Sequence, residues 1–169
     1  MKKVTLDSSC FSTFIKDLEI WENLYELKKR GKVKLFTTLK THNELFVKYF
    51  SKKPVRLNEK MKKKVKTFAD LFEKTELLQE LDETIDISEA IKLEVRIKDI
   101  LFPNKNLGMD DPKYDDLWSD VAIFLVHYIS RNDVFLTKDD DFLSKKHILE
   151  KEFNTRIENF YNYGTLIFS

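Results

Sequence analysis

Acidic side chains recur in this sequence directly after short hydrophobic segments. Asp7 follows Val-Thr-Leu, and Asp139 and Asp141 follow Val-Phe-Leu-Thr. Two further acids, Glu44 and Asp120, stand on segments with apolar residues at helical spacing. Carboxylates gathered in one crevice repel each other and raise each other's pKa, unless hard cations bind among them. Such a group suits Mg²⁺ or Mn²⁺, ions that can activate water and stabilise the charge of a phosphodiester.

These acids can act together only if the fold brings them to one place. Lys3–Asp7, Val33–Thr37 and Val134–Thr137 are predicted strands, separated by segments of helical spacing. Alternating strands and helices favour a parallel sheet with helices on both faces, which binds ligands beyond the carboxyl ends of its strands. If the first and last of these strands are neighbours, Asp7 and Asp139 meet at that edge.

Apolar spacing and capping signals predict the helices between the strands. They are the segment from Ser8 or Ser9 to Leu27, a segment from Thr41 to Phe50, Leu57–Leu81, Ser88–Leu101, Tyr114–Ser130 and Asp141–Glu150. A short strand at Thr84–Ile87, a loop at Phe102–Lys113 and one or two strands in the tail complete the prediction. We expect one domain over residues 1–169, with a helical segment at 52–101 and a weakly defined tail at 152–169.

Composition excludes several other classes of site. The chain has 169 residues, 42% of them hydrophobic, and a net charge of +1, which argues against bulk electrostatic binding of nucleic acid. Three glycines exclude a Gly-rich phosphate loop, and one cysteine excludes a disulfide framework or a multi-thiolate zinc site. The longest apolar run, Val121–Ile129, is too short to span a membrane. We therefore expect a cytoplasmic protein with no membrane partner.

Each acid also has a purely local explanation. Asp7 can cap the helix that follows it, and the spacing Thr41-x-x-Glu44 matches a capping box. Asp120 can be a solvated helix acid, although it shares a face with Ile123, which indicates partial burial.

The acids after the last strand have the same kind of explanation. Asp139, Asp140 and Asp141 can all serve as turn and first-turn helix charges, and Asp140 fits that role best. Asp115 and Asp116 are expected in a loop or a first helical turn. One shared cause for all the other positions is nevertheless simpler than separate coincidences.

Four stretches that carry these acids together resemble the motifs of the PIN-domain nucleases. They are Leu-Asp7-Ser-Ser, Thr38-x-x-Thr41-x-x-Glu44-Leu45, Asp120-Val-Ala-Ile123 and Leu136-Thr137-Lys-Asp139-Asp-Asp141-Phe142. Their order and spacing cover residues 3–142, and the last stretch is the most specific. The resemblance implies a three-layer α/β/α sandwich with a central parallel sheet and hydrolysis of RNA phosphodiester bonds.

The resemblance also assigns roles by position. Asp7, Glu44, Asp120 and Asp139 would be the core acids that bind Mg²⁺ or Mn²⁺. Asp141 would be an accessory catalytic acid, and Thr137 a polar support beside the core acids. For a toxin of this family, an antitoxin protein would be a partner, and a homodimer would be common.

Three features depart from the family pattern. Phe124 and Leu125 stand where small residues are usual, and Asn132 replaces a common glycine before the last strand. Asn tolerates the same left-handed backbone. The 52–82 segment and the 102–116 loop are longer than in short toxins, which puts the toxin role in question without altering the chemistry.

Basic and aromatic residues near the second helix are candidates for RNA contacts. Lys52, Lys53 and Arg56, with the lysines at 60–66, can bind the phosphate backbone. Tyr49 or Phe50 can stack on a base. A solvated helix face explains the lysines equally well, and core packing explains the aromatics.

Three alternative functions stay open at this point. A haloacid-dehalogenase-like phosphatase also uses a strand-end Asp and Mg²⁺, but Ser9 stands where that family has its second Asp. A catalytically inactive PIN-like module could bind RNA or act as a scaffold, and it would lack metal binding. In a generic α/β domain the acids are only caps, and neutralising Asp120 or Asp139 would change stability little.

Overall fold

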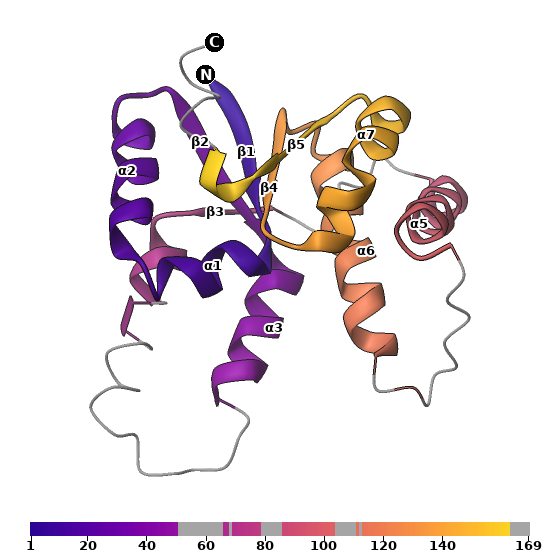
Figure 1. Ribbon diagram of the computed structural model, residues 1–169, viewed down its shortest axis with the longest axis horizontal. Helices are drawn as coiled ribbons and strands as arrows, with labels where there is room; N and C mark the ends of the chain where they lie inside the picture. The colour runs from indigo at the N-terminus through magenta and orange to yellow at the C-terminus, as the bar shows by residue number, and fades with distance from the viewer. Residues whose placement is uncertain (51–65, 68, 79–85, 104–110, 112, 163–169) are drawn as a thin grey trace.

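A parallel sheet forms the centre of the protein, seen here in a computed structural model (Figure 1). The structure describes residues 1–50, 66, 67, 69–78, 86–103, 111 and 113–162, with the backbone alone at 46–50. Within these residues the strand order is β3-β2-β1-β4-β5, and every neighbouring pair is parallel. The strands are β1 (Lys2–Leu6), β2 (Val33–Thr38), β3 (Glu76–Leu78), β4 (Val134–Thr137) and β5 (Arg156–Asn159).

Helices cover both faces of this sheet, as the alternation of predicted elements implies. The described helices are α1 (Ser8–Phe14), α2 (Leu18–Lys29), α3 (Leu39–Phe50), α5 (Ile87–Leu101), α6 (Tyr114–Ile129) and α7 (Asp140–Phe153). Figure 1 shows α1 and α2 on one side of the sheet and α5, α6 and α7 on the other. The predicted three-layer α/β/α sandwich is therefore the fold of this protein.

Alternating strand residues divide the core between the two faces. Val134 and Leu136 pack with the aromatic residues of α1 and α2, whereas Phe135 between them packs with α6 and α7. All four residues of β4 are buried, because a central parallel strand is covered on both faces. Strand β1 lies next to β4 and runs parallel to it, so the loops after β1 and β4 emerge side by side.

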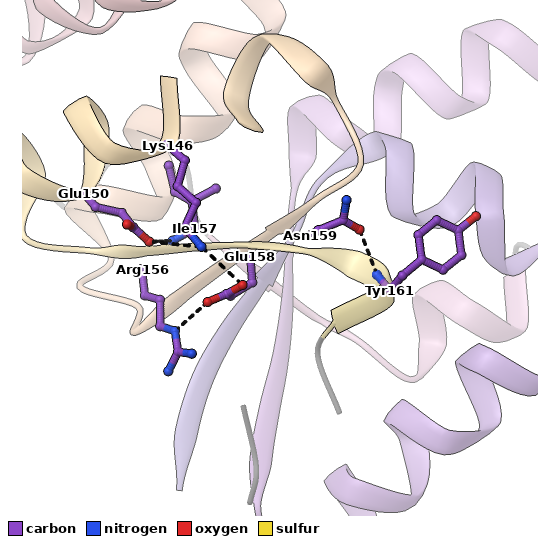
Figure 2. Close-up of polar contacts among 7 residues, drawn as sticks. All are labelled: Lys146, Glu150, Arg156, Ile157, Glu158, Asn159 and Tyr161. Carbon is purple, nitrogen blue, oxygen red and sulfur yellow. Dashed lines mark hydrogen bonds and ion pairs between the residues drawn. The ribbon is translucent and has the colours of Figure 1, made fainter. Parts of the chain in front are cut away.

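Helix α7 fixes the edge strand β5, as Figure 2 shows. The Glu150 carboxylate accepts the N–H of Ile157 at 2.8 Å, and Lys146 lies between Glu150 at 3.8 Å and Glu158 at 3.3 Å. The Nε of Arg156 donates to Glu158 at 2.8 Å. The Glu150 side chain thus accepts the hydrogen bond of one backbone N–H group of this strand, which protects the edge from pairing with another chain.

A neutral polar network crosses the α6 side of the sheet. His127, fully buried in α6, contacts the Thr5 hydroxyl through Nδ1 at 2.9 Å and the Thr155 hydroxyl through Nε2 at 2.7 Å. The Asn132 amide donates to Thr5 at 2.8 Å. Burial lowers the pKa of His127 to about 3, so its ring is neutral at physiological pH.

The predicted helix between Ser8 or Ser9 and Leu27 is wrong in one respect, because α1 and α2 are separate. The N–H groups of Lys16 and Asp17 both donate to the Thr13 carbonyl, which closes α1 in a turn. Phe14 and Trp21, on either side of this turn, pack into the same core. Their apolar spacing therefore continues across the break and hides it in the sequence.

The prediction of a helix through Leu81 is also wrong, because β3 occupies Glu76–Leu78. The Thr75 hydroxyl donates to the carbonyls of Leu71 and Phe72, where the helical stretch 69–73 ends. Strand β3 then pairs with β2 at the edge of the sheet. The 52–101 segment is thus not helical throughout, and a three-residue strand is too short to show its own periodicity.

The remaining differences concern element ends. The expected strand at Thr84–Ile87 is wrong at its end, because Asp86 caps α5 and Ile87 begins it. The tail from residue 152 is better defined than predicted, since α7 extends to Phe153 and β5 follows. Residues 163–169 and most of the predicted loop at 102–113 lie outside the described part.

Candidate active site

Asp7 stands at the carboxyl edge of the sheet, where β1 ends beside β4. Its N–H donates to the Leu136 carbonyl at 3.0 Å, which continues the pairing of the two strands by one residue. Its carboxylate is buried, and Oδ2 accepts hydrogen bonds from the hydroxyls of Ser9 at 2.6 Å and Thr137 at 2.9 Å. The same carboxylate caps α1 through the N–H of Ser9, so the predicted local role of Asp7 as a helix cap is confirmed.

Thr137 connects Asp7 with the acids that follow β4. The Thr137 hydroxyl donates to Asp7 and accepts the N–H of Asp139 at 2.9 Å. The Asp139 carboxylate in turn accepts the N–H of Asp141 at 2.8 Å and caps α7. One buried hydroxyl therefore fixes the relative position of two carboxylates that lie far apart in the sequence.

Glu44 reaches this edge from α3. The Thr38 hydroxyl accepts the N–H of Thr41 at 3.0 Å, so Thr38 caps the helix and Thr41 lies inside it. The capping-box explanation of Glu44 is therefore wrong, because that motif requires Thr41 at the cap. Hydrogen bonding to Ser119 and, to a smaller degree, to Ser8 lowers the pKa of the Glu44 carboxylate instead.

The environment of Glu44 disfavours its charge. Burial raises the pKa of Glu44 above its usual value, and the nearby charge of Asp7 raises it further. The hydrogen bonds from Ser119 and Ser8 act in the opposite direction, because they stabilise the charged form. Glu44 is thus a partly buried helix acid within the field of Asp7, an environment that a fully solvated position would avoid.

Asp120 is the most strongly perturbed acid of the site. Burial in α6 raises its pKa to about 9, with further contributions from the charges of Asp7, Asp139, Glu44 and Asp141. The partial burial predicted from its shared face with Ile123 is confirmed. In the metal-free protein, Asp120 is therefore a protonated carboxylic acid at neutral pH.

Asp139 has the same character to a smaller degree. Burial raises its pKa first, and the charges of Asp7, Asp141 and Asp140 add to this, while the hydrogen bond from the Asp141 backbone opposes it. Asp140 and Asp141 are exposed in the first turn of α7, where negative charge is favourable. Asp115 and Asp116 occupy the first turn of α6, as expected for local charges.

The structure thus brings together the four predicted core acids, with Asp141 at their rim and Thr137 beneath them. Ser9 and Ser119 also belong to the site, and the sequence analysis assigned them no role. Each stands within two residues of a core acid, which is the signal that could have identified them. Lys52, Lys53 and Arg56 lie outside the described residues, as do the side chains of Tyr49 and Phe50.

The oxygen donors fit a hard cation in chemistry, although their present arrangement is not a formed metal site. Among the described residues, no three His, Cys, Asp or Glu side chains are positioned to hold a metal ion. Asp7, Glu44 and Asp139 are each turned toward neutral donors of their own. Carboxylates that repel one another are expected to adopt such positions, and ligation would require them to turn inward.

Comparison with known proteins identifies the fold. A chain of the VapBC2 complex from Rickettsia felis, bound to a DNA fragment from its promoter, matches with a TM-score of 0.61 and 12% identity, over 93% of this chain and 98% of that chain. The TM-score is 0.56 at 17% identity for DNA-bound VapBC from Salmonella typhimurium, over 95% and 99% of the two chains. For VapBC-1 from nontypeable Haemophilus influenzae the TM-score is 0.54 at 13% identity, over 94% of this chain and 98% of that chain.

These likenesses extend over nearly the whole of each chain and confirm the predicted PIN-like fold. The sequence itself matches no protein-family model and no curated protein. In the described part of the chain, no helix has the length and apolar character required to cross a bilayer.

Proposed function

We propose that this protein is a metal-dependent endoribonuclease that hydrolyses RNA phosphodiester bonds at the carboxyl edge of its sheet. One observation carries the proposal, namely the pKa of Asp120, raised to about 9 by burial and by four neighbouring acids. Carboxylates forced together in this way destabilise the fold, and strongly perturbed acids in such a place are typical of functional sites. The PIN-like fold also supports a nuclease, but the fold alone does not specify RNA as the substrate.

The four core acids would hold Mg²⁺ or Mn²⁺. When bound, such an ion lowers the pKa of a coordinated water and polarises a phosphate oxygen. Asp7, which Ser9 and Thr137 orient in the metal-free protein, would turn toward the ion, and Asp120 would release its proton on becoming a ligand. Asp141, exposed at the rim, would orient the attacking water or accept its proton.

An antitoxin is the partner that this proposal implies. The structural neighbours come from VapBC toxin–antitoxin complexes, which supports a toxin of such a pair. A partner that inhibits the nuclease would cover the acidic edge or a groove beside it. We also expect RNA as the substrate, and a homodimer, which is common among PIN domains, would be compatible with this proposal.

The test is cleavage of a mixed RNA pool by the purified protein, with Mg²⁺, with Mn²⁺ and with a chelator. The variants are Asp120→Asn and Asp139→Asn, and the matched control is Asp116→Asn, an exposed acid in the first turn of the same helix as Asp120. We expect metal-dependent cleavage by the wild type and the control, and a loss of at least about 100-fold in the two site variants.

Two results would overturn the proposal. Cleavage that persists unchanged in Asp139→Asn would come from another site or from a contaminant. RNA binding without cleavage, in either metal and across the pool, would instead favour the catalytically inactive PIN-like module that binds RNA or acts as a scaffold.

A further inference from the structure

A polar cavity lies at the amino-terminal edge of the sheet, opposite the acidic edge. It has a volume of about 600 Å³, within the range of small-molecule sites. Its lining comes from the ends of α6 and α7 and the starts of β4 and β5: Tyr128, Arg131, Asn132, Asp133, Phe153, Asn154, Thr155 and Arg156. Because all strands run parallel, this cavity and the acidic edge are at opposite ends of the sheet.

Two guanidinium groups dominate the charge of this cavity. Arg131 forms no ion pair with any acidic side chain in the described part of the chain. Arg156 donates to Glu158 through Nε, and its two terminal nitrogens point away from that carboxylate in Figure 2. Asp133, the one acid in the lining, already accepts the N–H of Lys3 at 2.6 Å. Guanidinium groups with unoccupied donors are suited to phosphate oxygens.

The buried His127 network ends in this cavity at Thr155. One proton assignment is consistent along these contacts: Asn132 donates to Thr5, Thr5 donates to Nδ1 of His127, and Nε2 donates to Thr155. It leaves the Thr155 hydroxyl hydrogen without an acceptor among the described residues. A neutral chain of hydrogen bonds, buried at Asn132, Thr5 and His127, thus orients a hydroxyl donor at the wall of the cavity.

Aromatic side chains form another part of the wall. The rings of Tyr128 and Phe153 pack edge to face, with centroids 5.2 Å apart, and Tyr128 is only half-buried. Asn132, almost fully buried, adds an amide beside them. An exposed aromatic face next to amide groups is the combination that stacks a base and hydrogen-bonds its edge.

The backbone of the lining is unusual as well. Arg131 and Asn154 have φ of 51° and 46°, and both follow helices that end at this cavity. Asparagine is common at such a position, whereas an arginine there is not. The left-handed turn at Arg131 places its guanidinium group beside the cavity that it lines.

We propose that this cavity binds a nucleotide, with its phosphate at Arg131 and Arg156 and its base against Tyr128 and Asn132. The last carbonyls of α6 and α7 and the Asp133 carboxylate are hydrogen-bond acceptors near the same cavity. The same acceptors suit the N–H groups of a base. The nucleotide can be a free mononucleotide or one residue of an RNA strand, and the proposal is independent of the nuclease activity proposed above.

The test is isothermal titration calorimetry in a chelating buffer, so that no cation can bind at the acidic edge. The titrants are the four ribonucleoside monophosphates, inorganic phosphate and a single-stranded 2′-O-methyl RNA hexamer. The variants are Arg131→Asn and Arg156→Gln, and the matched control is Arg30→Gln, an exposed arginine at the end of α2. Arg131→Asn should fold, because asparagine tolerates positive φ.

We expect nucleotide binding that each cavity variant weakens by about tenfold and that Arg30→Gln leaves unchanged. Binding should also persist in Asp139→Asn, which separates this site from the acidic edge. Binding of the hexamer but not of monophosphates identifies RNA as the source, and binding of monophosphates identifies the free nucleotide. The proposal is overturned if nothing binds at about 5 mM, if inorganic phosphate binds as tightly as a nucleotide, or if Arg131→Asn has no effect.

Discussion

Two buried polar clusters lie at opposite ends of the same strands, and they differ in how their charges and hydrogen bonds are satisfied. The His127 cluster is neutral, and each ring nitrogen has a hydroxyl partner within 2.9 Å. The acidic cluster places Asp120 beside four other carboxyl groups and keeps it protonated near neutral pH. The His127 cluster is what a stable core requires, because its buried polar groups are paired.

The difference indicates that the acidic cluster destabilises the metal-free fold, whereas the His127 cluster does not. Neutral donors satisfy Asp7, Glu44 and Asp139 individually, and Lys40 contributes a favourable charge at Glu44, but protonation is what relieves the repulsion at Asp120 in the metal-free fold. A group that destabilises the metal-free fold is understandable if a cation compensates it during function. The comparison therefore predicts opposite responses when one member of each cluster is removed.

The largest effect is expected from His127→Ala. This change leaves a cavity in the core and removes the shared partner of Thr5 and Thr155, so we expect a loss of about 3–5 kcal/mol in the free energy of unfolding. Urea denaturation measures it. A loss below about 1 kcal/mol would show that the network is not a stabilising feature and would remove one side of the comparison.

Asp120→Asn is expected to act in the opposite direction. An amide needs no protonation to be buried, so the metal-free variant should be more stable than the wild type by about 2–4 kcal/mol at pH 7. Urea denaturation in a chelating buffer measures the difference, with Asp116→Asn as the control. A variant less stable than the wild type would mean that the ionised carboxylate has a compensating partner.

The two clusters should also give opposite pH dependences. Between about pH 4 and 6.5 the unfolded chain binds a proton at His127 and the folded chain holds one at Asp120, so these two groups act on stability in opposite directions. Above about pH 6.5 the contribution of His127 ends, and Asp120 lowers the unfolding free energy of the wild type by about 1.4 kcal/mol per pH unit up to its own pKa.

Asp120→Asn isolates the histidine in the same measurement. Relative to the wild type, its stability should rise more steeply up to about pH 6.5, as the unfolded chain loses its proton at His127, and it should lack the fall that Asp120 causes above that pH. Denaturation curves at a series of pH values test both slopes. A wild type whose stability does not change between pH 7 and 9 would contradict the raised pKa of Asp120.

The smallest effect is expected where a neutral hydroxyl supports the acids. Thr137→Val removes the donor to Asp7 and the acceptor for the Asp139 N–H, and should cost about 1–2 kcal/mol. Thr137→Ser keeps the hydroxyl and should restore most of this loss. If the two variants are equally destabilised, the methyl group of Thr137 rather than its hydroxyl is what the site depends on.

The positions of Asp7 and Asp139 could be predicted from the sequence because they depend on two strong local signals. Each follows a short hydrophobic strand, and parallel strands place such residues at one edge. Asp7 and Asp139 come together only if β1 and β4 are neighbours. The sequence left this open, and the structure shows that the two strands pair. The roles of these residues in catalysis stay predictions.

Other features could not be derived because the deciding contact lies elsewhere in the chain. Thr38 and Thr41 are equally good caps in the sequence, and only the Thr38 hydroxyl in place shows which one begins α3. Strand β3 exists through its pairing with β2, not through a pattern of its own. Ser119 stands beside Asp120 in the sequence, but its contact with Glu44 joins two helices that lie far apart along the chain.

Thermal unfolding with and without Mn²⁺, for the wild type and Asp139→Asn, tests the central claim that the acidic edge is a metal site. Asparagine is also a good helix cap, so the variant should keep α7 and the fold. At about 100 times its Kd, a ligand stabilises by about 2.7 kcal/mol, or roughly 5–10 °C for a chain of this size. We predict such an upward shift for the wild type and none for Asp139→Asn. If neither protein responds to millimolar Mn²⁺, or if both respond equally, the acids are not the metal site that the proposed nuclease requires.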